Sequence, residues 1–492
     1  MKKLVASVVV IGALLAVLVL GHVYRGSALI QAPFDVRAIV WESTPDDNGQ
    51  VEALTPAGVD QVLVDFPAGD QGNWAERCGQ DYWSSKGQGV AIFAGSKEGS
   101  LAIYPLAGGD PVPLGTVNRM ACAGPASFQF SPKGERVGYI NYATESLDRS
   151  FPYGNIEFYD AAAGTQQATF DWGTAFTLYD DGALMLRMYP DGKGNATEAD
   201  VDWWDGSAKQ TLVTLEPVYP PDKKDVECGF TSGSVARVGN SAYVLTGQKC
   251  ETGSADWRLV SVPMSGGAAT EIASGQPGGG FFPESFSTEL LPTKDGKGFL
   301  VVVPSGLARN TARLQWVTPD GQVTPLLEGQ HILVDRFGER LSEGRHMMLS
   351  ADGSTLAFVT VTGSGIQSLW MLDLSTPGGT PVVVQEQGAN ERIFQYAWTP
   401  TNVLYYIGGS IESNSLSSVT PGGSPKRVER GRFFQLAVSY DGSKVAAAEW
   451  YANPESVGDD LFKLDAFDSS GKSFVVKQGD KTHNQMVPLA VQ

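Results

Sequence analysis

The sequence predicts an all-β protein folded as a single β-propeller, and three observations support this fold class. A turn unit recurs along the chain after residue 75, and apolar strands flank each copy of it. No segment after residue 30 carries a helical period over about 11 residues. The 58 glycines and 28 prolines in 492 residues exceed an average share, which agrees with many turns.

The chain begins with a candidate membrane segment. Lys2 and Lys3 precede an uncharged apolar run over residues 4–20. This run is close to the roughly 20 residues that span a bilayer, so it favours an uncleaved signal anchor. A cleaved signal peptide, cut near Gly26-Ser27-Ala28, is the alternative. Both place the bulk of the chain outside the cytoplasm, in the periplasm or at the cell surface. We expect an anchor over 1–25, a segment with strands over 26–75 and the propeller over 76–492.

The repeated unit is clearest in SPKGERVGYINY (131–142), SADGSTLAFVTV (350–361) and SYDGSKVAAAEW (439–450). Asp-Gly, Lys-Gly and Gly-Asn turns tolerate positive φ and favour tight hairpins. Two further short strands follow each hairpin, and four antiparallel strands make one propeller blade. The turn residues number eight, at spacings of 40 to 57 residues: Gly87, Gly134, Gly182, Gly239, Gly296, Gly353, Asn402 and Gly442.

We therefore expect eight blades, with seven as the alternative. Residues 32–75 contain the strand-like pieces VRAIVWES and DQVLVDF, and one of these is expected to pair with the last blade and close the ring.

The Ser-x-Asp-Gly hairpin followed by a second strand pair resembles the TolB-type, WD-repeat-like propeller repeat, over about residues 76–480. The resemblance implies a propeller and leaves the function open. Several copies lack the aspartate, at Gly87, Gly134 and Gly239, and the helical N-terminal domain of TolB is absent.

The four cysteines lie beyond the apolar run, where disulfides persist. Cys228 and Cys250 are equidistant from Gly239, so an antiparallel hairpin places them opposite each other. Cys78 and Cys122 each precede the first strand of neighbouring blades. We predict the pairs Cys78–Cys122 and Cys228–Cys250.

Long insertions gather on the face opposite the hairpin turns, and loops of this length are functional or mobile. They carry aromatic residues, which suit binding, and one local basic cluster that suits an anion. The alternatives are rings packed under their own loops and arginines paired with nearby acids. The candidate binding residues are Tyr189, Tyr219, Phe281, Phe282, Phe286, Arg336, Phe337, Arg340, Trp450 and Tyr451.

The sequence offers little for catalysis. A net charge of -18 argues against nucleic acid as a partner, and four histidines and four cysteines leave little for a metal site. No G-x-S-x-G elbow is present, and paired carboxylates are too frequent to single out. We expect no cofactor and no metal.

The expected function is a non-catalytic interaction module that is tethered to the cell envelope and binds a protein or peptide there. A glycan or small-ligand sensor or carrier is the alternative. A propeller hydrolase that uses acidic residues near the axis is the least favoured reading.

Overall fold

The computed structural model describes residues 35–43, 49–66, 74–78, 89–122, 127–146, 152–191, 195–219, 226–251, 255–275, 289–293, 296–304, 311–333, 347–375, 378–452, 460–479 and 485–492. The chain divides into two units, Met1–Asp35 and Val36–Gln492. The predicted anchor lies outside the described residues. Among the residues that are described, no helix has the length and apolar character needed to cross a membrane.

Four sheets contain four strands each. We name them the closing quartet, quartet 1, quartet 7 and quartet 8. The closing quartet contains β1 (Ala38–Ser43), β2 (Gly49–Thr55), β3 (Gly58–Asp65) and β36 (Gln485–Val491). Quartet 1 contains β4 (Trp74–Arg77), β5 (Gly89–Gly95), β6 (Glu98–Pro105) and β7 (Val112–Asn118). Quartet 7 contains β28 (Arg392–Trp398), β29 (Leu404–Gly409), β30 (Asn414–Val419) and β31 (Lys426–Gly431). Quartet 8 contains β32 (Phe433–Val438), β33 (Lys444–Ala452), β34 (Asp460–Asp468) and β35 (Ser473–Gln478).

An eleven-stranded sheet joins quartets 2, 3 and 4. Quartets 2 and 3 share β11, and quartet 4 joins quartet 3 through a short pairing of β15 with β13. Quartet 2 contains β8 (Phe128–Phe130), β9 (Arg136–Tyr142), β10 (Gly154–Asp160) and the first half of β11 (Gln166–Tyr179). Quartet 3 contains the second half of β11, then β12 (Gly182–Pro190), β13 (Ala196–Trp204) and β14 (Lys209–Leu215). Quartet 4 contains β15 (Cys228–Val238), β16 (Ser241–Cys250), β17 (Ala255–Pro263) and β18 (Thr270–Gly275).

A nine-stranded sheet joins quartets 5 and 6. Quartet 5 contains β19 (Glu289–Pro292), β20 (Phe299–Pro304), β21 (Thr311–Val317) and β22 (Val323–Leu326). Quartet 6 contains β24 (Met347–Leu349), β25 (Thr355–Val361), β26 (Gln367–Asp373) and β27 (Val382–Glu386), and the short strand β23 (His331–Leu333) links β21 of quartet 5 to β25. The 3-10 helices among the described residues are η1 (Arg119–Cys122) and η2 (Thr144–Ser146).

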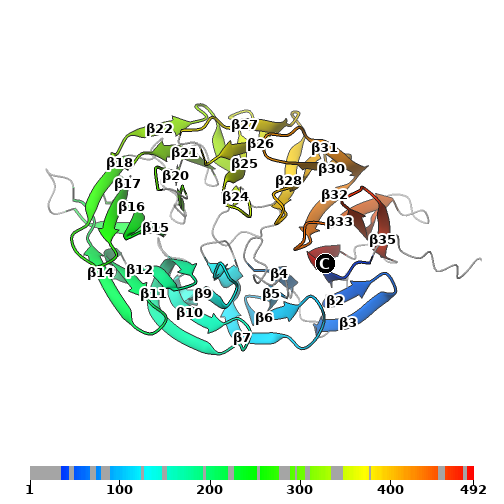
Figure 1. The fold of residues 1–492 in the computed structure, drawn as a ribbon, viewed down its shortest axis with the longest axis horizontal. Coiled ribbons are helices and arrows are strands. Elements are labelled where there is room, and N and C mark those ends of the chain that lie inside the picture. Colours follow the sequence, from blue (N-terminus) through cyan, green and yellow to red (C-terminus); the bar gives the residue numbers. More distant parts are fainter. Residues whose placement is uncertain are drawn as a thin grey trace, which may run out of the picture. The chain divides into compact units, whose positions relative to one another are not determined.

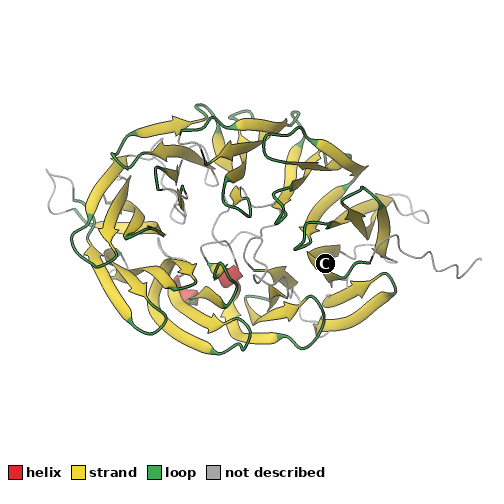
Figure 2. Cartoon of the chain, viewed as in Figure 1, coloured by secondary structure: helices red, strands yellow, loops and turns green. Residues whose placement is uncertain are grey.

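Within Val36–Gln492 the quartets follow one another around a ring (Figure 1). The first strand of each of quartets 1 to 8 lies toward the centre and the last lies outside. The described chain is almost entirely strands and connecting loops (Figure 2). This arrangement is that of a β-propeller, as the repeat predicts.

The ring closes differently from the prediction. The C-terminal strand β36 pairs with β1, and β1, β2 and β3 complete a sheet of four strands. The strands of 36–65 therefore do not join the sheet of quartet 8, which already has four strands of its own. The physical reason is that β36 supplies backbone partners along the whole of β1, so these strands build a separate sheet on it.

Seven of the eight predicted turn residues have a positive φ, as expected, and Gly87 lies outside the described residues. Gly134, Gly353 and Gly442 lie at φ between 67° and 71°, and Asn402 lies at φ 58°. Asn402 shows that an asparagine serves where the other turns use glycine, because its short side chain tolerates the left-handed region.

Both predicted disulfides are confirmed. Cys228 and Cys250 occupy opposite positions in the register of β15 and β16. Cys78, directly after β4, is bonded to Cys122 of η1, the segment that leads toward quartet 2. An oxidising compartment sustains such bonds, so they point to a location outside the cytoplasm.

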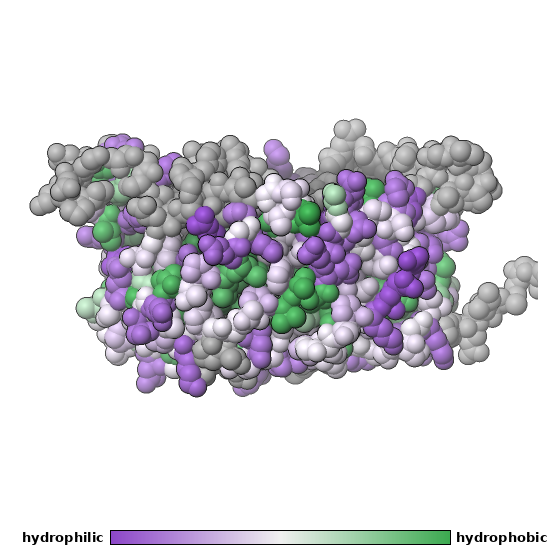
Figure 3. All heavy atoms as spheres, turned by 90° about the horizontal axis from the view of Figure 1, so that it is seen from above, coloured by the Kyte–Doolittle hydropathy of each residue, from purple (hydrophilic) through white to green (hydrophobic). Residues whose placement is uncertain are grey.

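The outer wall carries apolar patches between hydrophilic side chains (Figure 3). Most of the exposed valines in the described chain belong to outermost strands, namely Val59 and Val62 of β3, Val382 and Val383 of β27 and Val475 of β35, and Val218 follows β14. Scattered apolar residues of this kind are normal on a folded surface.

We predict that the double variant Cys228→Ser/Cys250→Ser is less stable than the wild type by about 2–4 kcal/mol, because the open hairpin gains freedom in the unfolded chain. Urea unfolding of both proteins measures the difference. The wild type in reducing agent serves as the comparison, and an unchanged midpoint in both samples would contradict the prediction.

Candidate functional site

Four of the ten predicted binding residues lie in the described chain: Tyr189, Tyr219, Trp450 and Tyr451. The other six, Phe281, Phe282, Phe286, Arg336, Phe337 and Arg340, lie outside the described residues. The structure does not bring the four together, because Tyr189 and Tyr219 belong to quartet 3 and its exit, whereas Trp450 and Tyr451 belong to quartet 8.

The rings of quartet 8 pack against their own quartet. Trp450 stacks on Phe434 with ring centroids 4.8 Å apart, and the edge of Phe462 meets both rings. The Tyr451 hydroxyl donates to the Gly479 carbonyl oxygen at 3.0 Å. These contacts correspond to the alternative reading, in which loop aromatics fill space beneath their own loops.

Tyr219 is the exposed member, with 43% of its surface accessible. Its backbone neighbour Val218 is held by the Gln248 side chain, whose amide bonds both the Val218 N–H at 2.8 Å and the Val218 carbonyl at 2.9 Å. Tyr219 therefore stays a candidate for binding.

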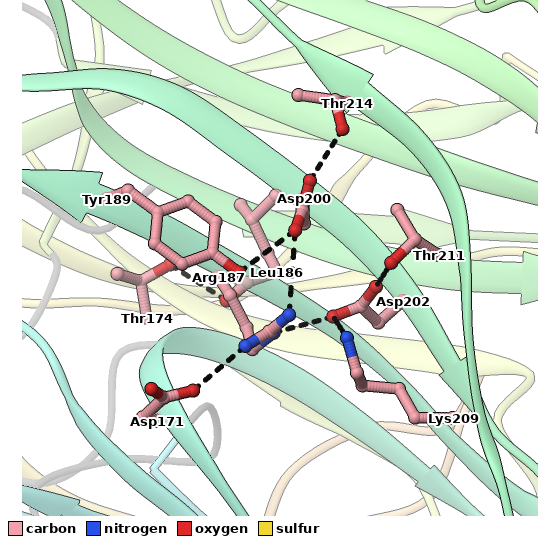
Figure 4. A network of polar contacts seen from close by, with 10 residues as sticks. All are labelled: Asp171, Thr174, Leu186, Arg187, Tyr189, Asp200, Asp202, Lys209, Thr211 and Thr214. Atoms are coloured by element: carbon pink, nitrogen blue, oxygen red, sulfur yellow. Dashed lines mark hydrogen bonds and ion pairs between the residues drawn. The ribbon is translucent and has the colours of Figure 1, made fainter.

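Tyr189 belongs to a polar network centred on Arg187 (Figure 4). The buried guanidinium donates from Nε to Asp202 at 2.5 Å and from Nη1 to Asp171 at 2.9 Å. The Tyr189 hydroxyl donates to Asp200 at 2.9 Å. Burial, and then the bond to Asp200, raise the pKa of Tyr189. Its hydroxyl is thus a structural donor in this network.

The same network satisfies its buried carboxylates fully. Asp202 is inaccessible to solvent, and it also accepts from Thr211 at 2.6 Å and from Lys209 at 3.3 Å. Thr214 donates to the second oxygen of Asp200 at 2.6 Å. A buried charge with this many partners stabilises one arrangement of strands, since removing a partner would leave an uncompensated charge.

A second network lies between β33 and β34. The Lys463 ammonium contacts the Glu449 carboxylate at 2.8 Å and the Asp465 carboxylate at 3.0 Å. Burial, followed by hydrogen bonding with Glu449, raises the pKa of Asp465 to about 7, against the opposing pull of Lys463. The Asp465 carboxyl therefore keeps its proton to a higher pH than an exposed aspartate does.

These two networks occupy equivalent positions in their quartets. Arg187 stands opposite Asp200, and Met185, two residues earlier, stands opposite Asp202. Glu449 stands opposite Lys463, and Ala447 stands opposite Asp465. The first strands of the two quartets agree as well. The pairing register shifts directly after Gly173, the partner of Arg187, and directly after Phe433, the partner of Glu449.

Other quartets place an acid at the position of Asp202 and Asp465. In the closing quartet it is Glu52, bonded to Lys477 of quartet 8 at 2.5 Å. In quartet 2 it is Glu157, which accepts from Tyr139 at 3.1 Å and from Tyr159 at 2.8 Å. The third strand thus repeatedly carries a buried carboxyl. In quartet 8 one lysine contacts this carboxyl and a second one, and Lys477 does the same with Glu52 and Glu42 of the closing quartet.

Sequence reasoning missed this pattern because acids are frequent along the chain. The signal was present in DVDWWD (200–205) and FKLDAFD (462–468), where charged and apolar residues alternate. Alternation puts the charges on one face of the strand. Whether that face is buried depends on the neighbouring quartet, which the sequence does not show.

No protein-family model and no curated protein matches the sequence. Among solved structures, the chain is similar to a prolyl endopeptidase at 11% identity and a TM-score of 0.44, covering 80% of this chain and 55% of that one. Prolyl oligopeptidase B from Galerina marginata gives 10% identity and a TM-score of 0.41, covering 85% of this chain and 52% of that one. A candidate 6-phosphogluconolactonase from Bacteroides fragilis gives 12% and 0.37, covering 87% and 99%.

The chain spans about half the length of the two peptidase structures. These identities and TM-scores assign no residue role to this chain. The structures are nevertheless those of enzymes, and this finding contradicts our expectation of a non-catalytic interaction module, which is wrong. The reason is that turn and strand patterns determine a propeller without determining the chemistry at its surface.

The raised pKa of Asp465 makes stability depend on pH. The folded state binds this proton more tightly than the unfolded chain, whose reference pKa is 3.8, so the wild type loses stability as pH rises toward about 7. We predict that Asp465→Asn, which cannot ionise, gains stability relative to the wild type over that range. Thermal unfolding at about pH 4.5, 6 and 8 measures the gain.

Asp468→Asn on the same strand is the matched control. Hydrogen bonding to Ser470 lowers the pKa of Asp468, so this group stays ionised from about pH 4.5 to 8. Its variant should differ from the wild type by a constant amount. A pH-independent difference for Asp465→Asn as well would contradict the prediction.

Proposed function

We propose that this chain is an extracytoplasmic β-propeller hydrolase and that Glu449 and Asp465 are its catalytic groups. One observation carries the proposal: two carboxyls from neighbouring strands contact a single ammonium, and one of them keeps a proton near neutral pH. Such a pair holds a base and an acid in contact, which hydrolysis requires.

In the proposed reaction the Glu449 carboxylate accepts a proton from a water molecule, and the hydroxide formed adds to the carbonyl carbon of the substrate. Asp465 gives its proton to the leaving oxygen as the acyl bond breaks. Proton transfer from Glu449 to Asp465 then restores the starting state. Lys463 is a positioning residue, because its ammonium contacts both carboxyls and holds them beside each other.

The geometry favours an acyl substrate over a glycoside. Glycosidases place a sugar between carboxyls that are about 5 Å or more apart. Here both carboxyls lie within 3.0 Å of the same Nζ, so no sugar ring fits between them. An ester or a lactone approaching from one side is compatible with this arrangement.

The proposal also covers the number of blades and the location of the protein. Strand pairing supports nine blades, in place of the eight predicted, because the closing quartet adds one sheet to quartets 1 to 8. The disulfides support a location outside the cytoplasm, and the apolar run over 4–20 supports an anchor there.

The test is hydrolysis of p-nitrophenyl esters and of γ- and δ-lactones by the purified chain. We expect measurable turnover of at least one substrate and a fall of at least about 100-fold in kcat for Asp465→Asn, the usual scale of acid–base catalysis. Because the reaction needs a protonated Asp465, kcat should decline as pH rises through about 7.

Asp468→Asn is the control and should keep kcat within twofold of the wild type, since its side chain lies in an exposed turn. Unchanged kcat in Asp465→Asn, or no hydrolysis of any substrate by the wild type, would refute the proposed function.

A further inference from the structure

The outer wall of quartet 6 ends in an exposed apolar strand. β27 is the outermost strand of its sheet, and no other described strand pairs with its free edge. Val382 is 65% exposed and its neighbour Val383 is 45% exposed. A charged residue or a proline usually protects a free edge, as Asp60 does in β3 and Pro325 in β22. The first four residues of β27 include neither, so this edge is open to pairing.

The outermost strand of the next quartet is basic, although the chain as a whole has a net charge of -18. β31 exposes Lys426, Arg427 and Arg430, and its one acid is Glu429. No carboxylate in the described part of the chain forms an ion pair with Arg427 or Arg430. The two guanidinium groups are therefore available to an anionic partner.

The strand register directs these two arginines toward quartet 6. Gly431 at the end of β31 faces quartet 8, because a Cβ built on it would lie 2.6 Å from an oxygen of Glu449. Successive residues of a strand point to opposite faces. Arg430, directly before Gly431, therefore faces quartet 6, and the pairing with β30 puts Arg427 on the same face as Arg430.

β27 turns an apolar side chain toward the same seam. Val382 stands opposite Met371, which belongs to the apolar cluster that quartets 6 and 7 share. Val384 of β27 and Val428 of β31 also pack against this cluster, and the two strands lie side by side on the rim of the ring (Figure 1). The outer mouth of the seam thus presents one exposed valine from β27 and two guanidinium groups from β31.

We propose that β27 and β31 form a docking surface for an extended acidic segment of a partner protein, which adds to β27 as a further strand. The free backbone groups of β27 supply hydrogen bonds to such a segment. Every second side chain of the added strand faces the seam, where a carboxylate meets Arg427 and Arg430. The other side chains lie beside Val383 and are apolar. The segment that fits therefore alternates acidic and apolar residues.

This surface is separate from Glu449 and Asp465 and does not depend on the proposed hydrolysis. Single exposed valines are normal on a folded protein and need no partner. β27 differs because two consecutive exposed valines coincide with an unprotected edge and with uncompensated positive charge on the strand beside it.

Fluorescence anisotropy of a short labelled peptide of alternating glutamate and valine, titrated with the full chain, tests the proposal. The matched probe has lysine in place of glutamate. We expect saturable binding of the glutamate peptide, at least about tenfold tighter than that of the lysine peptide and weaker at high salt. Arg427→Glu/Arg430→Glu should reverse this preference. Val383→Lys should weaken binding of the glutamate peptide about tenfold, because a bulky charged side chain protects the edge.

Lys426→Glu is the matched control, because Lys426 belongs to the same strand but lies on the face that Gly431 shares. Val475→Lys, on the outermost strand of quartet 8, is the control for the valine. Both should keep the affinity of the wild type within about twofold, since the seam-facing charges are unchanged. Circular dichroism confirms that each variant folds.

No saturable binding of the glutamate peptide, or an unchanged preference in Arg427→Glu/Arg430→Glu, would overturn the proposal. Sedimentation of the full chain adds a further outcome. A dimer of the wild type that Val383→Lys dissociates would make a second copy of this chain the occupant of the edge and would overturn the acidic partner.

Discussion

Pairing of β36 with β1 is the interaction on which the ring depends. Six residue pairs join the two strands. Two reciprocal backbone hydrogen bonds between Arg37 and Gln492 add a further pair at one end. Without β36 the three N-terminal strands would form a sheet with an open inner edge, and quartet 8 would face no neighbour. Closure removes both defects, because every sheet then packs between two others.

The seam between quartet 8 and the closing quartet also carries charged side chains that neutralise one another. Lys477 of quartet 8 bonds Glu42 and Glu52 of the closing quartet, so an ion cluster spans the point where the two chain ends meet. The related carboxyls Glu157 and Asp202 find partners within or beside their own quartets. Burial of each carboxyl is tolerated because its partners are complete, and this requirement fixes how neighbouring quartets align.

Much of the fold could be predicted from local patterns, and less of the candidate site. The turns at Gly134 and Asn402 and the Cys228–Cys250 bond follow from short-range spacing, and all three are confirmed. Trp450 and Tyr451 were predicted as binding residues from their place in a loop-rich region, yet they pack against quartet 8. Exposure depends on neighbours far away in the sequence, so no local pattern could decide it.

The sequence by itself determined where strands begin and turn, since turn chemistry and alternation act over a few residues. It also determined the hairpin disulfide, because a symmetric spacing about one turn fixes which residues face each other. Only the tertiary structure decided that the N-terminal strands form a quartet with β36, and that Glu449, Lys463 and Asp465 share one buried site. The first outcome rests on a contact between the two ends of the chain. The second rests on which face of the neighbouring strands β33 and β34 is buried, which local patterns leave open.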